Sequence, residues 1–219
     1  MEELYSRIAP VWDATLTFSR FKKGLCNYIK RVTKDIEIKD PKILDVGCGT
    51  GLLSFSLLKT FPKSSIVATD LNRDMLSQAR RLARKSKIST KRLVFVRSDV
   101  NSASSIELYS GKTMKLPKES FDVVIASGVL EYASLDLAVP ELFNLLKPGG
   151  FLIVISVKQN TPTGRLWGKI YHFKPISIKK MKDSLTKHGF EGIDSVPLSV
   201  KEFPANLTRV GMVARRPLE

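Results

Sequence analysis

The feature that most constrains the fold is the segment from Ile43 to Gly51, which reads ILDVGCGTG. Its first four residues form a short, mostly apolar run and indicate a buried strand. The glycines at 47, 49 and 51 allow a tight turn and the close approach of a ligand, and a helical pattern then begins at Leu52. A strand, a glycine turn and a helix in this order predict a βα unit of a parallel sheet.

The rest of the chain repeats this alternation, which predicts an α/β fold with a doubly wound, mostly parallel sheet and right-handed crossovers. Further strands are predicted at Ser65–Thr69, Leu93–Val96, Phe121–Ala126 and Phe151–Val157. Helices are predicted over Leu4–Lys34, Leu52–Thr60, 73–83 (capped by Asn72), Asp136–Leu146 (ended by Lys147–Gly150) and Ile178–His188. The late apolar stretches Gly192–Lys201 and Thr208–Arg215 predict a closing C-terminal antiparallel hairpin at one edge.

Composition narrows the class of protein. The chain of 219 residues has a net charge of +15, which makes nucleic acid or an anionic membrane surface a candidate partner. We find no export signal and no apolar run near the ~18 residues of a membrane span, so we expect a soluble, cytoplasmic protein. Cys26 and Cys48 are too few for a disulfide framework or, by themselves, a zinc site, and we expect no metal.

The glycines of this turn are spaced differently from those of known nucleotide-binding turns, and an acidic residue follows downstream. G-x-G-x-G differs from the G-x-G-x-x-G of nicotinamide-binding folds, and no Lys-Ser/Thr pair of a nucleoside triphosphate cradle follows. Asp70 stands 19 residues after Gly51, at the predicted end of the second strand. An acid there can accept hydrogen bonds from the ribose hydroxyls of an adenosine, or it can simply cap the following helix. Glycine-rich turns also occur without a ligand.

Taken with Asp70, the segment Ile43–Gly51 resembles the class I S-adenosylmethionine-dependent methyltransferase family. Further likeness lies in Ser98–Val100, Leu116–Val124, Leu130–Tyr132 and Leu145–Gly150. An opening with Tyr5, Ala9, Trp12 and Asp13 is similar to the subgroup that includes ubiquinone and menaquinone biosynthesis methyltransferases. The resemblance covers most of residues 1–157. It implies a Rossmann-like, seven-stranded sheet, S-adenosyl-L-methionine as cofactor and S-adenosyl-L-homocysteine as product.

The sequence departs from the family pattern in two places. Asp99 and Leu116 lie 17 residues apart, farther than is usual, and the polar insert 101–113 predicts a loop with a short strand or turn at Gly111. Ser6 stands where the family often has an acid. We expect one domain, with an N-terminal helical cap (1–40), a cofactor-binding core (41–157) and an acceptor-side region with the closing hairpin (158–219).

The resemblance also implies which residues hold the cofactor. Asp45 would lie near the amino end of the methionine moiety, and Asp70 would bind the ribose diol. The turn, with Gly47, Cys48, Gly49 and Gly51, would run along the methionine and ribose. Leu71 would flank the adenine, Asp99 would accept from its amino group, and Val100 would donate a backbone amide. Ser127 would lie near the methionine carboxylate or the reactive methyl, and Tyr5 would close the pocket.

A sulfonium methyl is already activated, so the protein must mainly place the acceptor in line and exclude water. Candidates for a general base or an acceptor-facing group are His172, Glu131 and Tyr132. Each has a structural alternative: His172 can belong to a surface loop, and Glu131 can cap a helix or pair with a cation. Trp12 and Trp167 can line an aromatic acceptor pocket or pack in the core. Cys48 lacks a nearby histidine and is not expected to be a nucleophile.

The sequence therefore predicts methyl transfer to an O, N or C atom of a small molecule. An alternative acceptor is RNA, or a membrane-associated lipid or quinone, docked by the cation-rich windows 73–97 and 158–188. The third reading is a non-catalytic cofactor-binding module, which the intact glycine turn and Asp70 disfavour. The absence of an Asn/Asp-Pro-Pro-Tyr/Phe segment after the fourth strand disfavours methylation of exocyclic amines.

Overall fold

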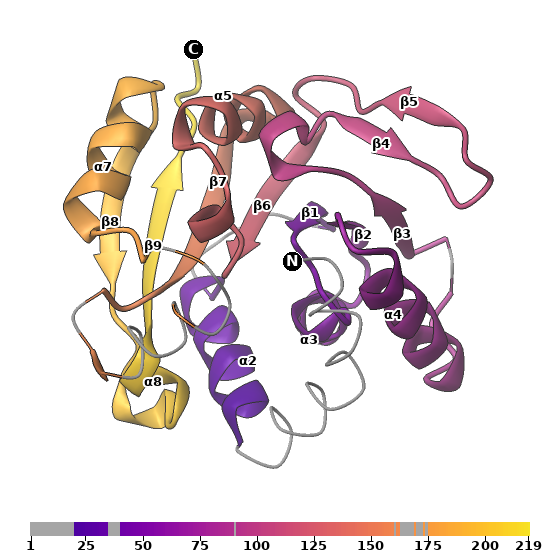
Figure 1. The fold of residues 1–219 in the computed structure, drawn as a ribbon, viewed down its shortest axis with the longest axis horizontal. Helices are drawn as coiled ribbons and strands as arrows, with labels where there is room; N and C mark the ends of the chain where they lie inside the picture. Colours follow the sequence, from indigo (N-terminus) through magenta and orange to yellow (C-terminus); the bar gives the residue numbers. More distant parts are fainter. Residues whose placement is uncertain are drawn as a thin grey trace.

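The computed structural model describes residues 20–34, 40–89, 91–159, 161–162, 169, 173 and 175–219. Its centre is a nine-stranded sheet with the order β5-β4-β3-β2-β1-β6-β7-β9-β8 (Figure 1). The strands are β1 (Lys42–Val46), β2 (Ser65–Asp70), β3 (Leu93–Arg97), β4 (Ser105–Glu107), β5 (Thr113–Lys115), β6 (Phe121–Ser127), β7 (Leu146–Val157), β8 (Glu191–Val196) and β9 (Arg209–Arg215).

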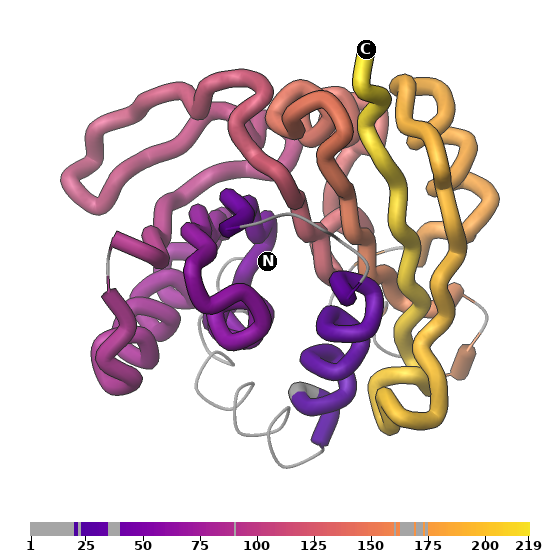
Figure 2. The backbone as a smooth tube through the Cα atoms, turned by 180° about the vertical axis from the view of Figure 1, so that it is seen from behind, coloured from indigo at the N-terminus to yellow at the C-terminus, as the bar shows by residue number. Residues whose placement is uncertain are grey.

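Helices cover both faces of the sheet (Figures 1 and 2). The α-helices are α2 (Phe21–Val32), α3 (Leu52–Thr60), α4 (Arg73–Lys85), α5 (Leu135–Leu145), α7 (Ile178–Lys187) and α8 (Ala205–Thr208). Short 3₁₀ helices are η1 (Val100–Ser102), η2 (Leu130–Tyr132) and η3 (Val200–Glu202). In the described ranges, no helix combines the length and the hydropathy that crossing a membrane requires.

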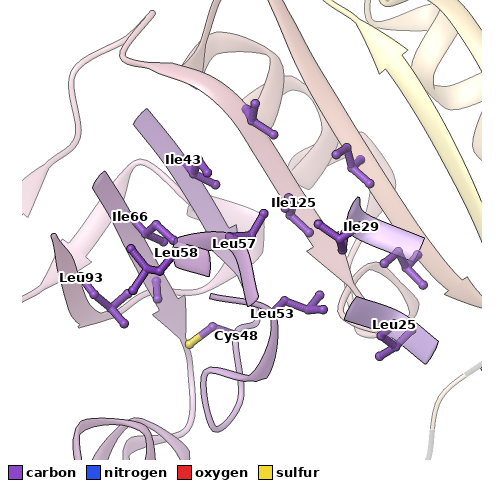
Figure 3. Close-up of a cluster of buried hydrophobic side chains, with 14 of the residues drawn as sticks. Leu25, Ile29, Ile43, Cys48, Leu53, Leu57, Leu58, Ile66, Leu93 and Ile125 are labelled. Atoms are coloured by element: carbon purple, nitrogen blue, oxygen red, sulfur yellow. The ribbon is translucent and has the colours of Figure 1, made fainter. Parts of the chain in front are cut away.

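The sheet separates two apolar clusters because side chains alternate between its faces. One cluster joins α2, α3 and α4 to residues such as Ile43, Ile66 and Ile125. Figure 3 shows side chains of α2, α3 and the strands in this cluster. The other joins α5 and α7 to residues such as Leu44 and Val124. Strands β1, β2, β3, β6 and β7 are parallel, so their carboxyl ends meet at one edge of the sheet. Ligands bind at this edge in open α/β sheets.

The doubly wound α/β prediction is confirmed, but the sheet has two more strands than the seven expected. The additional strands, β4 and β5, come from the insert, where a loop with a short strand or turn was predicted. They extend the sheet beyond β3, with Arg97 of β3 opposite Glu107 of β4. Arg73 and Arg97 form ion pairs with Glu107, and Ile106 of β4 is buried at 4% exposure, so ion pairs and one apolar side chain hold this hairpin. The strand predictions rested on the periodicity of apolar residues, which contains no information about ion pairs.

The predicted C-terminal antiparallel hairpin is confirmed: β9 is antiparallel to β8, and it is also antiparallel to β7, so the pair closes one edge of the sheet. The connection from β8 to β9 contains η3 and α8. Strand β7 begins at Leu146, which was predicted as the last residue of a helix, and includes the predicted stop signal, because Leu146 already pairs with Phe121 before the register shifts. Of the predicted helix Leu4–Lys34, α2 lies in the described part, and residues 1–19 lie outside it.

Candidate active site

The glycine turn after β1 is shaped by backbone that only glycine adopts readily. Gly47, Gly49 and Gly51 have φ values of 65°, 53° and 83°, in the left-handed region. A Cβ on Gly47 would lie 2.5 Å from the Cβ of Val129, whereas a Cβ on Gly49 would meet no atom within 4 Å. Gly47 therefore lets the chain pack closely, and Gly49 leaves open space beside the backbone.

Asp70, the last residue of β2, fastens this turn to the neighbouring strand. Its Oδ2 accepts a hydrogen bond from Gly49 N at 2.8 Å, and its Oδ1 accepts one from Asn72 N at 2.8 Å. The alternative role, capping α4, belongs instead to Asn72, whose Oδ1 accepts from the amides of Asp74 and Met75 at 2.9 and 3.0 Å. Each carboxylate oxygen of Asp70 can accept a further hydrogen bond, as a ribose diol requires.

Asp45 is the buried acid of the site, with 1% of its surface exposed. Ser54 Oγ, on α3, donates to its Oδ2 at 2.5 Å. The pKa of Asp45 is raised to about 7, because burial and, to a smaller extent, the nearby Asp70 raise it more than the Ser54 hydrogen bond lowers it. A cation bound beside Asp45 would favour its ionised form, which suits the ammonium group of a methionine moiety.

Asp99 and Val100 lie at the carboxyl end of β3, where η1 begins. Asp99 Oδ1 accepts hydrogen bonds from the backbone and side-chain nitrogens of Asn101, at 2.9 and 3.0 Å. Ser98 Oγ donates to Ser105 O at 2.9 Å, so the start of the inserted hairpin is tied back to the end of β3. The register of this corner is therefore held despite the insert. Leu71, after β2, is about half exposed, as an adenine-flanking residue would need to be.

Cys48 is buried within the turn. Burial and the neighbouring Asp70 and Asp45 raise the pKa of its thiol well above the usual value. Because a protonated thiol is a poor nucleophile, this environment argues against covalent catalysis by Cys48.

Strand β6 ends in a second turn, in which Ser127 was predicted to lie near the cofactor and Gly128 was not singled out. Ser127 is partly exposed, and Gly128 has a φ of 66° with open space where a Cβ would point. Gly128 N donates to Ile155 O at 2.8 Å, which ties this turn to β7. Ser54 and Asn101 were also missed. A glycine directly after a predicted strand was the available signal for Gly128, but polar partners of Asp45 and Asp99 have no sequence signature.

The candidate acceptor-side residues are only partly within the described structure. Glu131 is buried: its Oε1 accepts from Val157 N at 2.6 Å, while Oε2 is buried without a hydrogen bond. Burial raises the pKa of Glu131. Tyr132 packs edge-on against Phe173, with ring centroids 5.3 Å apart. Residues Tyr5, Trp12, Trp167 and His172 lie outside the described ranges.

The cation-rich windows are partly structural. In 73–97, Arg80 donates to Phe95 O at 2.9 Å, and Arg92 donates to Ser64 O at 3.3 Å. In 158–188, Lys158 lies at the end of β7 and donates to Asn206 O at 2.6 Å, while most of the other described cations lie on α7, over the sheet face that α5 also covers. Across the part of the chain that the structure describes, no group of three or more His, Cys, Asp or Glu side chains could hold a metal ion.

The family described as methyltransferase domain matches residues 38–186 of this chain. The chain belongs to this family, and the resemblance to class I S-adenosylmethionine-dependent methyltransferases is confirmed. S-adenosylmethionine is the cofactor of this class, and the residues of the two turns and the strand-end acids fit it.

Individual relatives agree with the assignment. A demethylmenaquinone methyltransferase from Chlorobaculum parvum is 29% identical over 93% of this chain and 78% of its own length. A hybrid PKS-NRPS synthetase from Trichoderma harzianum is 28% identical over 82% of this chain, which spans only 4% of that protein. A SAM-dependent methyltransferase from Thermotoga maritima superimposes with a TM-score of 0.69 at 17% identity, covering 99% of this chain and 100% of that one, which shows the shared fold.

Proposed function

We propose that this enzyme transfers the methyl group of S-adenosylmethionine to a small-molecule acceptor at a carbon, nitrogen or oxygen atom. The observation that carries the proposal is the joint geometry of Asp70 and the glycine turn. Both oxygens of this carboxylate are oriented by backbone amides at 2.8 Å, beside the open space at Gly49. A rigid acid next to an open glycine backbone suits the ribose and methionine portions of an adenosyl ligand.

Each residue of the site would hold a different part of the cofactor. When bound, S-adenosylmethionine supplies a methyl group on a sulfonium that leaves without further activation. Asp70 would hold the ribose hydroxyls, Asp45 would attract the ammonium group, and Asp99 would accept from the adenine amino group. The second turn, at Ser127 and Gly128, would line the methionine end. The protein's contribution to the rate is then orientation and exclusion of water.

For the acceptor, we propose a hydroxylated aromatic ring, such as a reduced quinone precursor, as the first class to test. The support is that relatives named as demethylmenaquinone methyltransferases align over more than nine tenths of this chain. Glu131 is the described acid nearest in sequence to the second turn, and its buried Oε2 has no hydrogen bond. We propose that Glu131 positions the end of β7 through Val157 rather than accepting a proton from the acceptor.

The test is a product screen with isotopically labelled S-adenosylmethionine against quinol precursors, phenols, small acids, amines and total RNA. We expect label in a small molecule, and the variant Asp70→Ala should reduce it. Label that enters RNA alone would overturn the small-molecule proposal in favour of the RNA reading. Failure to bind S-adenosylmethionine by calorimetry would overturn both.

A further inference from the structure

The connection between β8 and β9 exposes three large apolar side chains close together. Val200, Phe203 and Leu207 are 81%, 60% and 54% exposed, and they lie within eight residues of sequence, on η3, at its C-cap and on α8. We refer to these three side chains as the apolar tip. Single exposed apolar residues are ordinary, but several on one short connection indicate contact with an apolar partner or phase.

The backbone that carries the apolar tip is anchored to α2 by an ion pair and hydrogen bonds. Arg31 of α2 forms an ion pair with Glu202 at 3.0 Å and donates to Pro197 O at 2.9 Å. Ser199 and Glu202 form a capping box at the start of η3, and Ala205 is fully buried. Because these contacts fix the backbone of the connection on α2, the tip side chains are held in solvent while their neighbours are buried.

The surroundings of the apolar tip are strongly basic. Residues 20–34, which include α2, contain six Lys and Arg and no Asp or Glu. Residues 197–209 contain Lys201 and Arg209 and a single acid, Glu202, which is buried and paired with Arg31. No exposed acid within these two segments offsets the positive charge, so the surface around the tip is complementary to an anionic one.

The apolar tip also lies at the functional edge of the sheet. Lys158 N, just after β7, donates to Thr208 O at 2.9 Å, and Arg209 pairs with Val157, the last residue of β7. Figures 1 and 2 both place α8 beside α2 at the end of the molecule where β7 finishes and β9 begins. This is the edge at which the parallel strands end, the edge that carries the glycine turn and Asp70.

We propose that the apolar tip docks this enzyme on an anionic lipid bilayer. Val200, Phe203 and Leu207 would enter the interfacial region, and the Lys and Arg side chains of α2 and Lys201 would contact lipid phosphates. Three side chains are too few for a stable protein partner, which needs roughly 800 Å² from each side. Two of the three are aliphatic and offer bases no stacking surface, which disfavours RNA. Docking in this way would bring the functional edge of the sheet, where we expect the methyl acceptor to bind, close to lipophilic molecules dissolved in the bilayer.

The experiment is co-sedimentation of the full chain with vesicles of phosphatidylcholine containing about 30% phosphatidylserine, compared with phosphatidylcholine alone. We expect binding to the anionic vesicles and little to the neutral ones. The triple variant Val200→Ser, Phe203→Ser and Leu207→Ser should bind at least about tenfold more weakly, since each apolar side chain adds to interfacial affinity. The measurement contains neither cofactor nor acceptor, so its outcome is independent of the proposed methyl transfer.

Two controls isolate the apolar tip. The matched triple variant Leu137→Ser, Ile178→Ser and Leu218→Ser removes three other exposed apolar side chains and should bind as the wild type does. The charge variant Lys23→Glu with Lys201→Glu should weaken binding, whereas Lys112→Glu with Lys115→Glu, on the far β4–β5 hairpin, should have a smaller effect. Circular dichroism and S-adenosylmethionine binding check that each variant is folded.

Three outcomes would overturn the proposal. The first is a wild-type protein that does not sediment with anionic vesicles. The second is an equal loss in the tip variant and the matched control variant, which would mean that general surface hydrophobicity causes the binding. The third is tip-dependent binding of a single-stranded oligouridine in place of vesicles, which would assign the surface to RNA.

Discussion

At the scale of single residues, we expect cofactor binding to depend most on the side chain of Asp70. We expect Asp70→Ala to weaken S-adenosylmethionine binding by about 1–3 kcal/mol, because the ribose hydroxyls and the amides of Gly49 and Asn72 all lose their acceptor. Calorimetric titration measures the change, and the melting temperature of the apo variant separates it from loss of the fold. An unchanged affinity would remove Asp70 from the site.

Asp45 should make cofactor binding sensitive to pH near neutrality. Its pKa is raised to about 7 in the free protein, so below that value it is mostly protonated and cannot pair with an ammonium group. Affinity for S-adenosylmethionine should therefore increase as pH rises from about 5.5 to 7.5, by at most tenfold per unit. The variant Asp45→Asn should bind S-adenosylmethionine more weakly, with an affinity that does not change with pH. A variant that keeps the slope would show that another group titrates.

The residues that the sequence predicted well are those whose role is set by the backbone. Gly47 and Gly49 could be predicted because a positive φ demands glycine, and Asn72 because a helix start demands a cap. The Ser54–Asp45 hydrogen bond and the burial of Glu131 Oε2 could not, since they depend on how α3 and η2 pack on the sheet. Tyr5 and His172 remain predictions.

At the scale of elements, the first turn is expected to tolerate a side chain least at Gly47. Gly47→Ala should reduce the free energy of unfolding by about 2–4 kcal/mol, because strained φ and the overlap with Val129 act together. Gly111→Ala is the matched control: its φ is 84°, but the space around it is open, so the loss should be nearer 1 kcal/mol. Equal losses in urea denaturation would show that the Val129 contact relaxes.

Arg31 of α2 and Glu202 of η3 should contribute to stability as a coupled pair. Glu202 is 2% exposed, and its pKa is lowered because Arg31 and Ser199 outweigh the effect of burial. Glu202→Ala should cost about 1–3 kcal/mol of stability, discounted for the partial exposure of Arg31. A double-mutant cycle with Arg31→Ala measures the coupling, which should fade as acid protonates Glu202. Additive losses would mean that the two residues act separately.

Elements bounded by clear turn signals were predicted almost to the residue, as α3, between Gly51 and Pro62, and β6 illustrate. The pair β4–β5 was not, because it is short, exposed and held by the ion pairs of Glu107. The antiparallel pair β8–β9 was predicted from two late apolar runs, but η3 and α8, which lie in its connection, were not predicted.

At the scale of the whole molecule, the cations behind the net charge of +15 fall into two groups, those engaged within the fold and those around the apolar tip. Arginines such as Arg73, Arg92 and Arg97 are engaged by Glu107 or by carbonyl groups within the fold. The cations around the apolar tip face no exposed acid in segments 20–34 and 197–209. Salt should therefore act on docking through this end of the molecule more than on the cofactor site.

This separation predicts how activity responds to ionic strength. Turnover of a water-soluble, uncharged acceptor should be nearly independent of salt, whereas vesicle binding should fall steeply because exposed charges are screened beyond about 10 Å at 0.1 M. A single-stranded RNA acceptor would instead give an apparent affinity whose log–log slope is near −0.7 per phosphate contacted. Parallel titrations of turnover and vesicle binding with potassium chloride measure both responses. Turnover that falls as steeply as vesicle binding would mean that the acceptor itself is held by the basic surface.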